Sequence, residues 1–184
     1  ASYAGAPTAG RVMNATGVGE VVESNDKRIS VGDRVLGPLG WQSYSDHRAE
    51  TLNKIDSTRN PEDYLGPLGV NGLTAYFGLL SVARPKAGEL VMVSAAAGSV
   101  GHLVGQMARI KECQVVGVMG SDSKGEILKN QLGFNTVVNY KDPNYRQSLK
   151  EATDPGVDVY FDNTGGMILG LSLIHISEPT RRLV

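Results

Sequence analysis

Two kinds of apolar pattern alternate along the chain from about residue 71 onward. Short apolar runs that suit buried strands, bounded by turn residues, cover 90–95, 114–120, 135–140 and 157–166. Before and between these runs, apolar residues recur at helical spacing over 71–89, 99–112, 123–133 and 144–153. Strands and helices that alternate in this way predict a parallel sheet with helices on its faces, which is an α/β fold.

The first third of the chain has a different pattern. Short β-forming stretches bounded by Gly, Asn and Asp occur at 17–24, 33–37 and 41–47. No amphipathic segment long enough for a helix precedes residue 61. This part is typical of a piece of a small β domain. We therefore expect a β domain over 1–65 and an α/β domain over 66–170.

The composition is that of an ordinary globular protein and gives no reason to expect several kinds of partner. The chain has 184 residues, 41% of them hydrophobic, and a net charge of −1, which gives no electrostatic reason to expect nucleic acid or an anionic membrane. No apolar run approaches the ~18 residues of a membrane span. Cys113 is the only cysteine, so an internal disulfide and a four-cysteine zinc site are excluded. We expect a cytoplasmic protein; a removed signal peptide stays an alternative because the chain begins with Ala1.

The stretch LSLIHISEPTR, at 171–181, breaks the alternation. All eleven of its residues resemble an in-frame translation of the transposon end and adapter used to tag sequencing libraries. We therefore predict that the biological sequence stops near residue 170 and that 171–184 is a non-native tail. A natural strand followed by a turn is the alternative. Sequencing an independent copy of the gene would decide between them.

The turn between the first strand of the α/β part and the next helix has the pattern of a phosphate-binding loop. It reads AAGSVG over residues 96–101. A dinucleotide fold needs a tight turn, a residue without a side chain beside the pyrophosphate, and a small residue where the helix packs on the strand. Ala96, Gly98 and Gly101 hold these three positions, so the N–H groups that open the helix would face phosphates. A glycine-rich bend in a core is the alternative.

The end of the second strand indicates which dinucleotide fits. NAD-preferring sites place Asp or Glu there, about 20 residues after the turn, on the ribose hydroxyls. Here the strand end at Met119 carries no acid, and Ser121 and Lys124 follow. A hydroxyl and a cation favour a 2′-phosphate and so predict NADPH, although the adjacent Asp122 weakens this preference. A solvated surface lysine is the alternative for Lys124.

Several stretches resemble the zinc-independent medium-chain reductases, and within them the group of prostaglandin reductases, leukotriene B4 dehydrogenases and curcumin reductases. The resemblance covers nearly all of residues 10–168. Its most specific motifs are GLTAYFG at 72–78 and YFDNTGG at 160–166, with VSAAAGSVG and VVGVMGSDSK between them. The resemblance implies a partial GroES-like β domain followed by a truncated Rossmann-type domain that binds NADP.

The resemblance also implies positions for the cofactor. Lys124 and Tyr140 would hold the 2′-phosphate. Asn163 would lie near the ribose or nicotinamide, and Thr74 would approach the nicotinamide. Judged from the residues alone, Tyr140 would be an ordinary strand-end aromatic and Asn163 a turn residue. Together, the residues assigned to NADPH are Thr74, Gly98, Ser99, Val100, Gly101, Ser121, Lys124, Tyr140 and Asn163.

The reaction that the resemblance implies is reduction of the C=C bond of α,β-unsaturated ketones or aldehydes, with hydride transfer from NADPH to the β-carbon. Zinc-dependent relatives need a Cys/His/Glu site that this chain lacks, so no metal is expected. Trp41 is expected to line the substrate pocket, and a place in the β-domain core is its alternative. Val70 and Asn71 stand where the group has Met-Pro, so the wall near the nicotinamide is expected to differ. The group's proton-relay tyrosine falls outside this sequence, so no catalytic residue is assigned.

Two alternative functions stay open: a zinc-free NADPH quinone reductase, and a dinucleotide-binding protein without turnover. The expected partners are a small-molecule enone or enal and, for the full-length protein, a second copy in a homodimer. Because strands of both domains are expected to be missing, residues 1–170 alone are predicted neither to fold cooperatively nor to turn over substrate.

Overall fold

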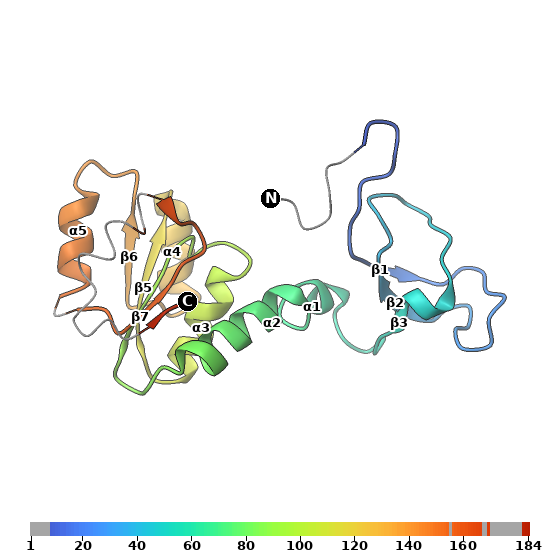
Figure 1. The fold of residues 1–184 in the computed structure, drawn as a ribbon, viewed down its shortest axis with the longest axis horizontal. Coiled ribbons are helices and arrows are strands. Elements are labelled where there is room, and N and C mark those ends of the chain that lie inside the picture. The colour runs from blue at the N-terminus through green and yellow to red at the C-terminus, as the bar shows by residue number, and fades with distance from the viewer. Residues whose placement is uncertain (1–7, 155, 167–168, 170–181) are drawn as a thin grey trace. The chain divides into compact units, whose positions relative to one another are not determined.

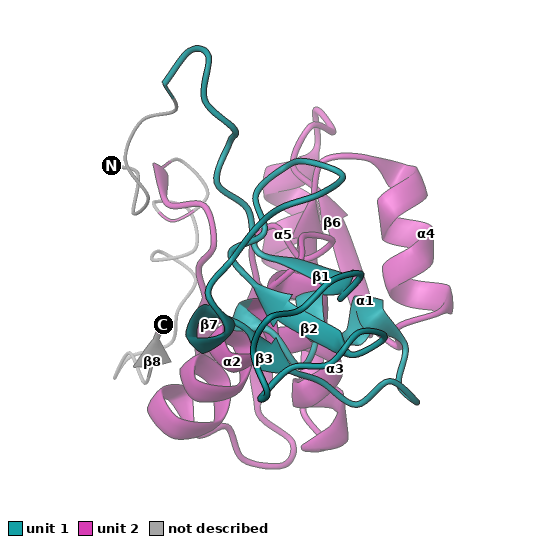
Figure 2. Ribbon diagram, turned by 90° about the vertical axis from the view of Figure 1, so that its right-hand side faces the viewer, with its two compact units in different colours: residues 1–70 teal, residues 71–184 magenta. Residues whose placement is uncertain are grey.

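A computed structural model describes residues 8–154, 156–166, 169 and 182–184. The chain divides into two compact units, Ala1–Val70 and Asn71–Val184, which Figure 2 shows in different colours. The division comes five residues after the boundary expected at 65. The predicted adapter-derived segment at 171–181 lies outside the described residues.

Unit 1 contains a small antiparallel sheet with the strand order β1-β2-β3. Its elements are β1 (Gly17–Glu20), β2 (Arg34–Gly37), the 3-10 helix η1 (Ala49–Thr51), β3 (Asn53–Lys54) and α1 (Pro61–Leu65). A tight turn leads into β2, where Gly32 has a φ of +87° and Asp33 N–H donates to Ser30 O. Few side chains of this unit are buried, with Ile29 and Val35 as its inaccessible hydrophobic residues among those described.

The strand predicted at 41–47 is wrong. Those residues form bends and loop, and the second edge of β2 pairs with β3 instead, with Leu36 opposite Asn53. Trp41 and Tyr44 suggested a strand because aromatic residues favour pleated, half-buried surfaces. In the structure these two side chains are 75% and 79% exposed, so no sheet face buries them.

Unit 2 is built on a parallel sheet with the order β6-β5-β4-β7-β8. The strands are β4 (Leu90–Val93), β5 (Gln114–Met119), β6 (Thr136–Asn139), β7 (Val159–Phe161) and β8 (Arg182–Leu183). The predicted α/β fold with four parallel strands is thereby confirmed. β8 adds a fifth strand from within the tail that was expected to be non-native.

The helices of unit 2 follow the predicted alternation. They are α2 (Val70–Tyr76), which starts at the unit boundary, its π-helical continuation η2 (Phe77–Ala83), α3 (Gly101–Ile110), α4 (Asp122–Asn130) and α5 (Tyr145–Ala152). The single helix predicted at 71–89 therefore ends at Ala83, where Arg84 adopts a left-handed conformation with φ +51°. Helix α5 covers one face of the sheet, and α3 and α4 cover the other (Figure 1).

The sheet separates two hydrophobic clusters because successive strand residues face opposite sides. In β4, Val91 and Val93 pack with residues of η2 and α3, whereas Met92 packs with Leu149 of α5 on the other side. The same alternation occurs in β7, where Tyr160 faces the α5 side. This rigid core fixes the carboxyl ends of the strands, where the candidate site lies.

Candidate dinucleotide-binding site

The strand order reverses beside β4, and the candidate site lies at that point. The chain runs from β4 outward to β5 and β6, and then returns to place β7 on the opposite side of β4. Ligands of open parallel sheets bind outside the carboxyl ends of the strands at such a reversal. The segments that follow β4 and β7 here are residues 94–101 and 162–166.

The turn after β4 brings the predicted phosphate-binding residues into one loop. Ala95 has a positive φ of 44°, and Gly98 N–H donates to its carbonyl oxygen at 2.8 Å. Ala96 is fully buried, and its N–H donates to Val118 O in the neighbouring strand at 2.9 Å. Within the described chain, no acceptor bonds the N–H groups of residues 99–101, which lead into α3. Unpaired N–H groups at the start of a helix fit an anionic phosphate.

Gly101 is required by the close approach of α3 to this turn. A Cβ at this position would lie 2.4 Å from Ala95 O and 2.9 Å from the Cα of Ala96. Both neighbours are backbone atoms of the turn, so they cannot move aside easily. Gly98 has more room, since its Cβ would lie 3.1 Å from Ala95 O. Residues 98 and 99 are exposed, so ligand atoms can reach their backbone.

The imidazole of His102 holds this turn from the first turn of α3. Its Nδ1 lies 2.7 Å from Gly98 O, which also accepts the His102 N–H at 3.1 Å. A carbonyl oxygen only accepts hydrogen bonds, so Nδ1 carries the proton in this contact. In the sequence, His102 follows Gly98 by four residues, which is one helical turn. That spacing alone was not enough to predict the contact.

A polar network joins the end of β4 to the segment after β7. The fully buried Ser94 donates its hydroxyl to Asp162 Oδ1 at 2.8 Å and accepts Asn163 N–H at 2.8 Å. Asn163 Nδ2 donates to Ser94 O at 2.9 Å. Asn163, which the sequence assigned near the ribose or nicotinamide, therefore lies at the strand reversal, within 2.9 Å of the end of β4.

Asp162 is the centre of that network, and no role was predicted for it. Besides Ser94, its carboxylate accepts the Tyr160 hydroxyl at 2.8 Å and the N–H groups of Thr164 and Gly165 at 3.1 and 2.9 Å. Burial raises the pKa of Asp162, but the hydrogen bonds, from Ser94 first, outweigh this effect and hold its pKa below the ordinary value. The acid next to the strand end in YFDNTGG was the only sequence signal for this role.

Of the residues assigned to a 2′-phosphate, Ser121 and Tyr140 lie beside Gly120 at the end of β5, and Lys124 lies in the first turn of the helix that follows. A Cβ on Gly120 would lie 2.8 Å from the hydroxyl oxygen of Tyr140, so the glycine makes room for this aromatic side chain, which is 40% exposed. Ser121 precedes α4, and its Oγ lies 3.4 Å from Ser123 Oγ. Lys124, in the first turn of α4, is exposed and has no ion-pair partner in the part of the chain that is described.

Asp122, the acid beside these groups, is engaged elsewhere. Asn139, the last residue of β6, donates its Nδ2 to Asp122 Oδ1 at 2.8 Å. Asn139 Oδ1 accepts Lys141 N–H at 3.0 Å. Both residues line a hollow of about 480 Å³ beside α4 and β6.

Two further predicted residues, Thr74 and Trp41, belong to other elements of the chain. Thr74 is an exposed residue of α2. Trp41 belongs to unit 1, where its indole is 75% exposed, so it is not part of that unit's core.

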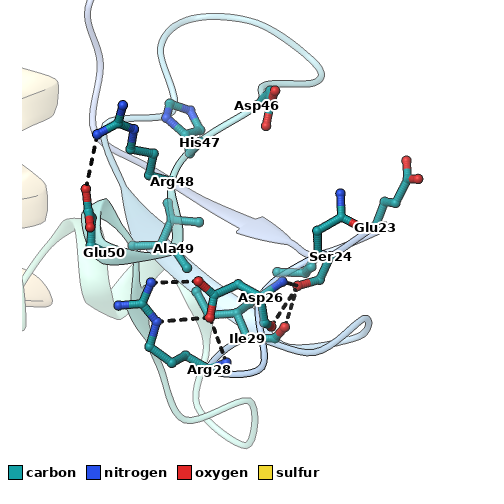
Figure 3. A pocket seen from close by; sticks show the side chains of 13 residues that line it. Glu23, Ser24, Asp26, Arg28, Ile29, Asp46, His47, Arg48, Ala49 and Glu50 are labelled. Carbon is teal, nitrogen blue, oxygen red and sulfur yellow. Dashed lines mark hydrogen bonds and ion pairs between the residues drawn. The ribbon is translucent and has the colours of Figure 1, made fainter.

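Unit 1 has a hollow of its own, of about 570 Å³, shown in Figure 3. The guanidinium of Arg28 pairs with Asp26 there through two hydrogen bonds of 2.9 and 2.6 Å, which lower the pKa of Asp26 to about 2. Arg48 faces Glu50 at 3.6 Å. These are exposed ion pairs of the kind that stabilise a protein little, so they do not indicate a reactive centre.

Neither a metal site nor a membrane span is found in the described part of the chain. No group of three or more His, Cys, Asp or Glu side chains could hold a metal ion among these residues. Likewise, none of the helices described has the length and apolar character needed to cross a membrane.

Known proteins resemble both parts of the chain. Residues 1–55 match a family described as the N-terminal domain of oxidoreductase, and residues 99–177 match one described as zinc-binding dehydrogenase. Prostaglandin reductase 1 of Bos taurus is 42% identical over 92% of this chain and 53% of its own length. The NADP(+)-dependent 2-alkenal reductase of Nicotiana tabacum is 42% identical over 95% of this chain and 52% of its own length. The crystal structure of CurA from Vibrio vulnificus in complex with NADPH has a TM-score of 0.89 at 33% identity, over 100% of this chain and 54% of that one.

The sheet, the turn after β4 and these matches define the class: an α/β oxidoreductase fold with a GroES-like part and a Rossmann-type part. Within that class, the chain is a homologue of the medium-chain reductases that include prostaglandin reductase and 2-alkenal reductase, so the resemblance found in the sequence is confirmed. The chain spans about half the length of the curated relatives it matches.

Proposed function

We propose that the whole protein to which this chain belongs reduces the C=C bond of α,β-unsaturated ketones or aldehydes with NADPH. The observation that carries the proposal is the 42% identity to an NADP(+)-dependent 2-alkenal reductase over 95% of the chain. The geometry supports the cofactor half of this proposal, because the two turns at the carboxyl edge of the sheet suit a pyrophosphate and a 2′-phosphate. The substrate class is supported by the relatives alone.

The residues of unit 2 suit NADPH in three places. The N–H groups of residues 99–101, together with the glycines of this turn, would hold the pyrophosphate. Ser121, Lys124 and Tyr140 would hold the 2′-phosphate, since Ser121 and Tyr140 supply hydroxyls beside Gly120 and Lys124 supplies a cation in the first turn of α4. Asn163 and Thr74 would serve the nicotinamide end. Asn163 is held for this task by its bonds to Ser94.

When bound, the reduced nicotinamide supplies a hydride for the electron-poor β-carbon of the substrate. The described residues contribute binding and orientation. The hydrogen bond that Ser94 donates to Asp162, and those that it accepts from Asn163, would fix the segments that follow β4 and β7. We assign no proton donor, and Trp41 is proposed as a wall of the substrate pocket.

The test is NADPH oxidation by the whole protein with two kinds of acceptor. An enone or 2-alkenal that is reduced, while a quinone of similar size is not, would support the proposal. Faster reduction of the quinone would favour the alternative of a zinc-free quinone reductase. NADPH binding without oxidation by either acceptor would favour a binding protein without turnover. The cytoplasmic location and the homodimer stay predictions, and gel filtration of the whole protein checks the second.

A further inference from the structure

Asp122 stands at a sequence position from which a carboxylate could bind the ribose of the cofactor. In the structure this carboxylate accepts a hydrogen bond from Asn139. Asp122 follows Gly101 by 21 residues, the spacing at which NAD-preferring sites place the carboxylate that binds the ribose hydroxyls. A carboxylate in that place would repel a 2′-phosphate. The inference below rests on the proposed function, because it concerns the choice between NADPH and NADH at the same site.

The contact between Asn139 and Asp122 has a defined orientation. Asn139 Oδ1 is taken by Lys141 N–H at 3.0 Å, so the amide must present its Nδ2 donor to Asp122, at 2.8 Å from Oδ1. The backbone of Asn139 is fixed as well, since it lies opposite Met119 in the parallel register of β6 and β5. The half-buried Asn139 is therefore a rigid anchor for an exposed carboxylate.

The Asp122 carboxylate and the three residues proposed to bind the 2′-phosphate do not line the same hollow. Asp122 and Asn139 line the hollow of about 480 Å³ together with Glu126, Lys129 and Ser148. Among the described residues, its lining includes none of the three 2′-phosphate candidates. Tyr140, the very next residue after Asn139, instead contacts Gly120. Asn139, the last residue of β6, thus binds the Asp122 carboxylate, whereas the next residue, Tyr140, places its hydroxyl beside Gly120.

We propose that Asn139 is a positioning residue that makes the site prefer NADPH by holding the Asp122 carboxylate away from the 2′-phosphate. Without the amide, the carboxylate is free to turn toward the ribose. There it would accept hydrogen bonds from the hydroxyls of NADH and repel the phosphate of NADPH. The preference is then set by a contact outside the phosphate site itself.

The experiment measures dissociation constants for NADPH and NADH with the whole protein and four variants, together with the thermal midpoint of each. We expect Asn139→Ala to lower the NADPH-over-NADH preference about tenfold, as for like charges brought close at a protein surface. Asp122→Asn should leave the preference high, and the double variant Asp122→Asn/Asn139→Ala should restore it. Asn130→Ala, the same change on the same hollow, should leave it unaltered.

The outcomes separate this inference from the proposed function. A preference that stays low in the double variant would overturn the inference, because the effect would not pass through Asp122. If Asn139→Ala weakened the binding of NADPH and NADH equally, the inference would be overturned too, because Asn139 would then only stabilise the local structure. A whole protein that binds neither dinucleotide would contradict the proposed function itself, and the inference with it.

Discussion

The two turns that carry the candidate site lie at the same edge of one sheet but are built from different parts of the chain. The turn after β4 consists of backbone that packs closely against Gly101 and is exposed at residues 98 and 99, with N–H groups at residues 99–101 that no described acceptor bonds. The turn after β5 presents exposed side chains around Gly120. A backbone turn can recognise only the pyrophosphate that all dinucleotides share. Side chains can distinguish one dinucleotide from another.

The largest effect should come from breaking the backbone turn. In Gly101→Ala, the new Cβ would meet Ala95 O at 2.4 Å, so the turn or the helix must shift. We expect the free energy of unfolding to fall by about 1–3 kcal/mol, as for other overpacked sites. Displacing the N–H groups proposed to bind the pyrophosphate should weaken NADPH and NADH alike, by about tenfold to a hundredfold. Denaturant unfolding and titration of both dinucleotides check these values.

Gly125→Ala is the matched control for this variant. It makes the same change in the first turns of α4, where the nearest atom to the new Cβ is the flexible Cε of Met119 at 2.7 Å. We expect a change in unfolding free energy close to zero, because the methionine end can move and alanine favours the helix. Unequal losses of the two dinucleotides in Gly101→Ala would contradict the comparison between the turns.

The same difference explains what the sequence could predict. The backbone turn was found because it depends on glycine spacing between a strand and a helix, which are contiguous in sequence. The strands of unit 2 were found because both of their faces are buried, which gives nearly continuous apolar runs. Contacts between side chains distant in sequence gave no comparable signal. Ser94 and Asp162 are 68 residues apart, and Asp122 and Asn139 are 17 apart.

Unit 1 shows why the remaining part of the fold was harder to predict. Its strands have only two to four residues, and its side chains are mostly exposed, so periodicity has little length over which to appear. The aromatic residues at 41 and 44 therefore suggested a strand that is absent there, and β3 at 53–54 went undetected. The position of β3 in this small sheet is set by its hydrogen bonds to β2 rather than by a local sequence pattern.

A smaller and more selective effect should come from the turn after β5. Lys124→Ala removes a cation from the proposed 2′-phosphate site and leaves the backbone turn intact. We expect NADPH to bind about tenfold more weakly, which is the size of one charge-assisted hydrogen bond, and NADH to bind almost as before. The difference between the two proteins should shrink at high salt, because the contact is exposed. Titrations of both dinucleotides at two ionic strengths measure this.

Lys129→Ala serves as the control, since it removes an exposed lysine from the last turn of the same helix. It should leave both affinities unchanged. If Lys124→Ala weakened NADH as much as NADPH, the lysine would act on the shared part of the cofactor, and the division of roles between the two turns would be wrong.

The smallest effect concerns Asp162, whose side chain accepts the hydroxyl of Ser94 at the start of the turn after β4. In Asp162→Asn, an amide nitrogen in the place of Oδ2 cannot accept Gly165 N–H, which Oδ2 accepts at 2.9 Å, and the charge is lost. We expect a loss of about 1 kcal/mol in unfolding free energy at pH 7.

Because the folded-state pKa of Asp162 is lowered, its stabilisation is present above the unfolded value of about 3.9 and is lost as the pH falls through the folded value. The difference in melting temperature from wild type should therefore be constant from pH 8 to 5 and shrink below pH 4, while the exposed Asp154→Asn shows no such difference. A gap that stays constant as the pH falls below 4 would mean that shape, and not charge, is what Asp162 contributes.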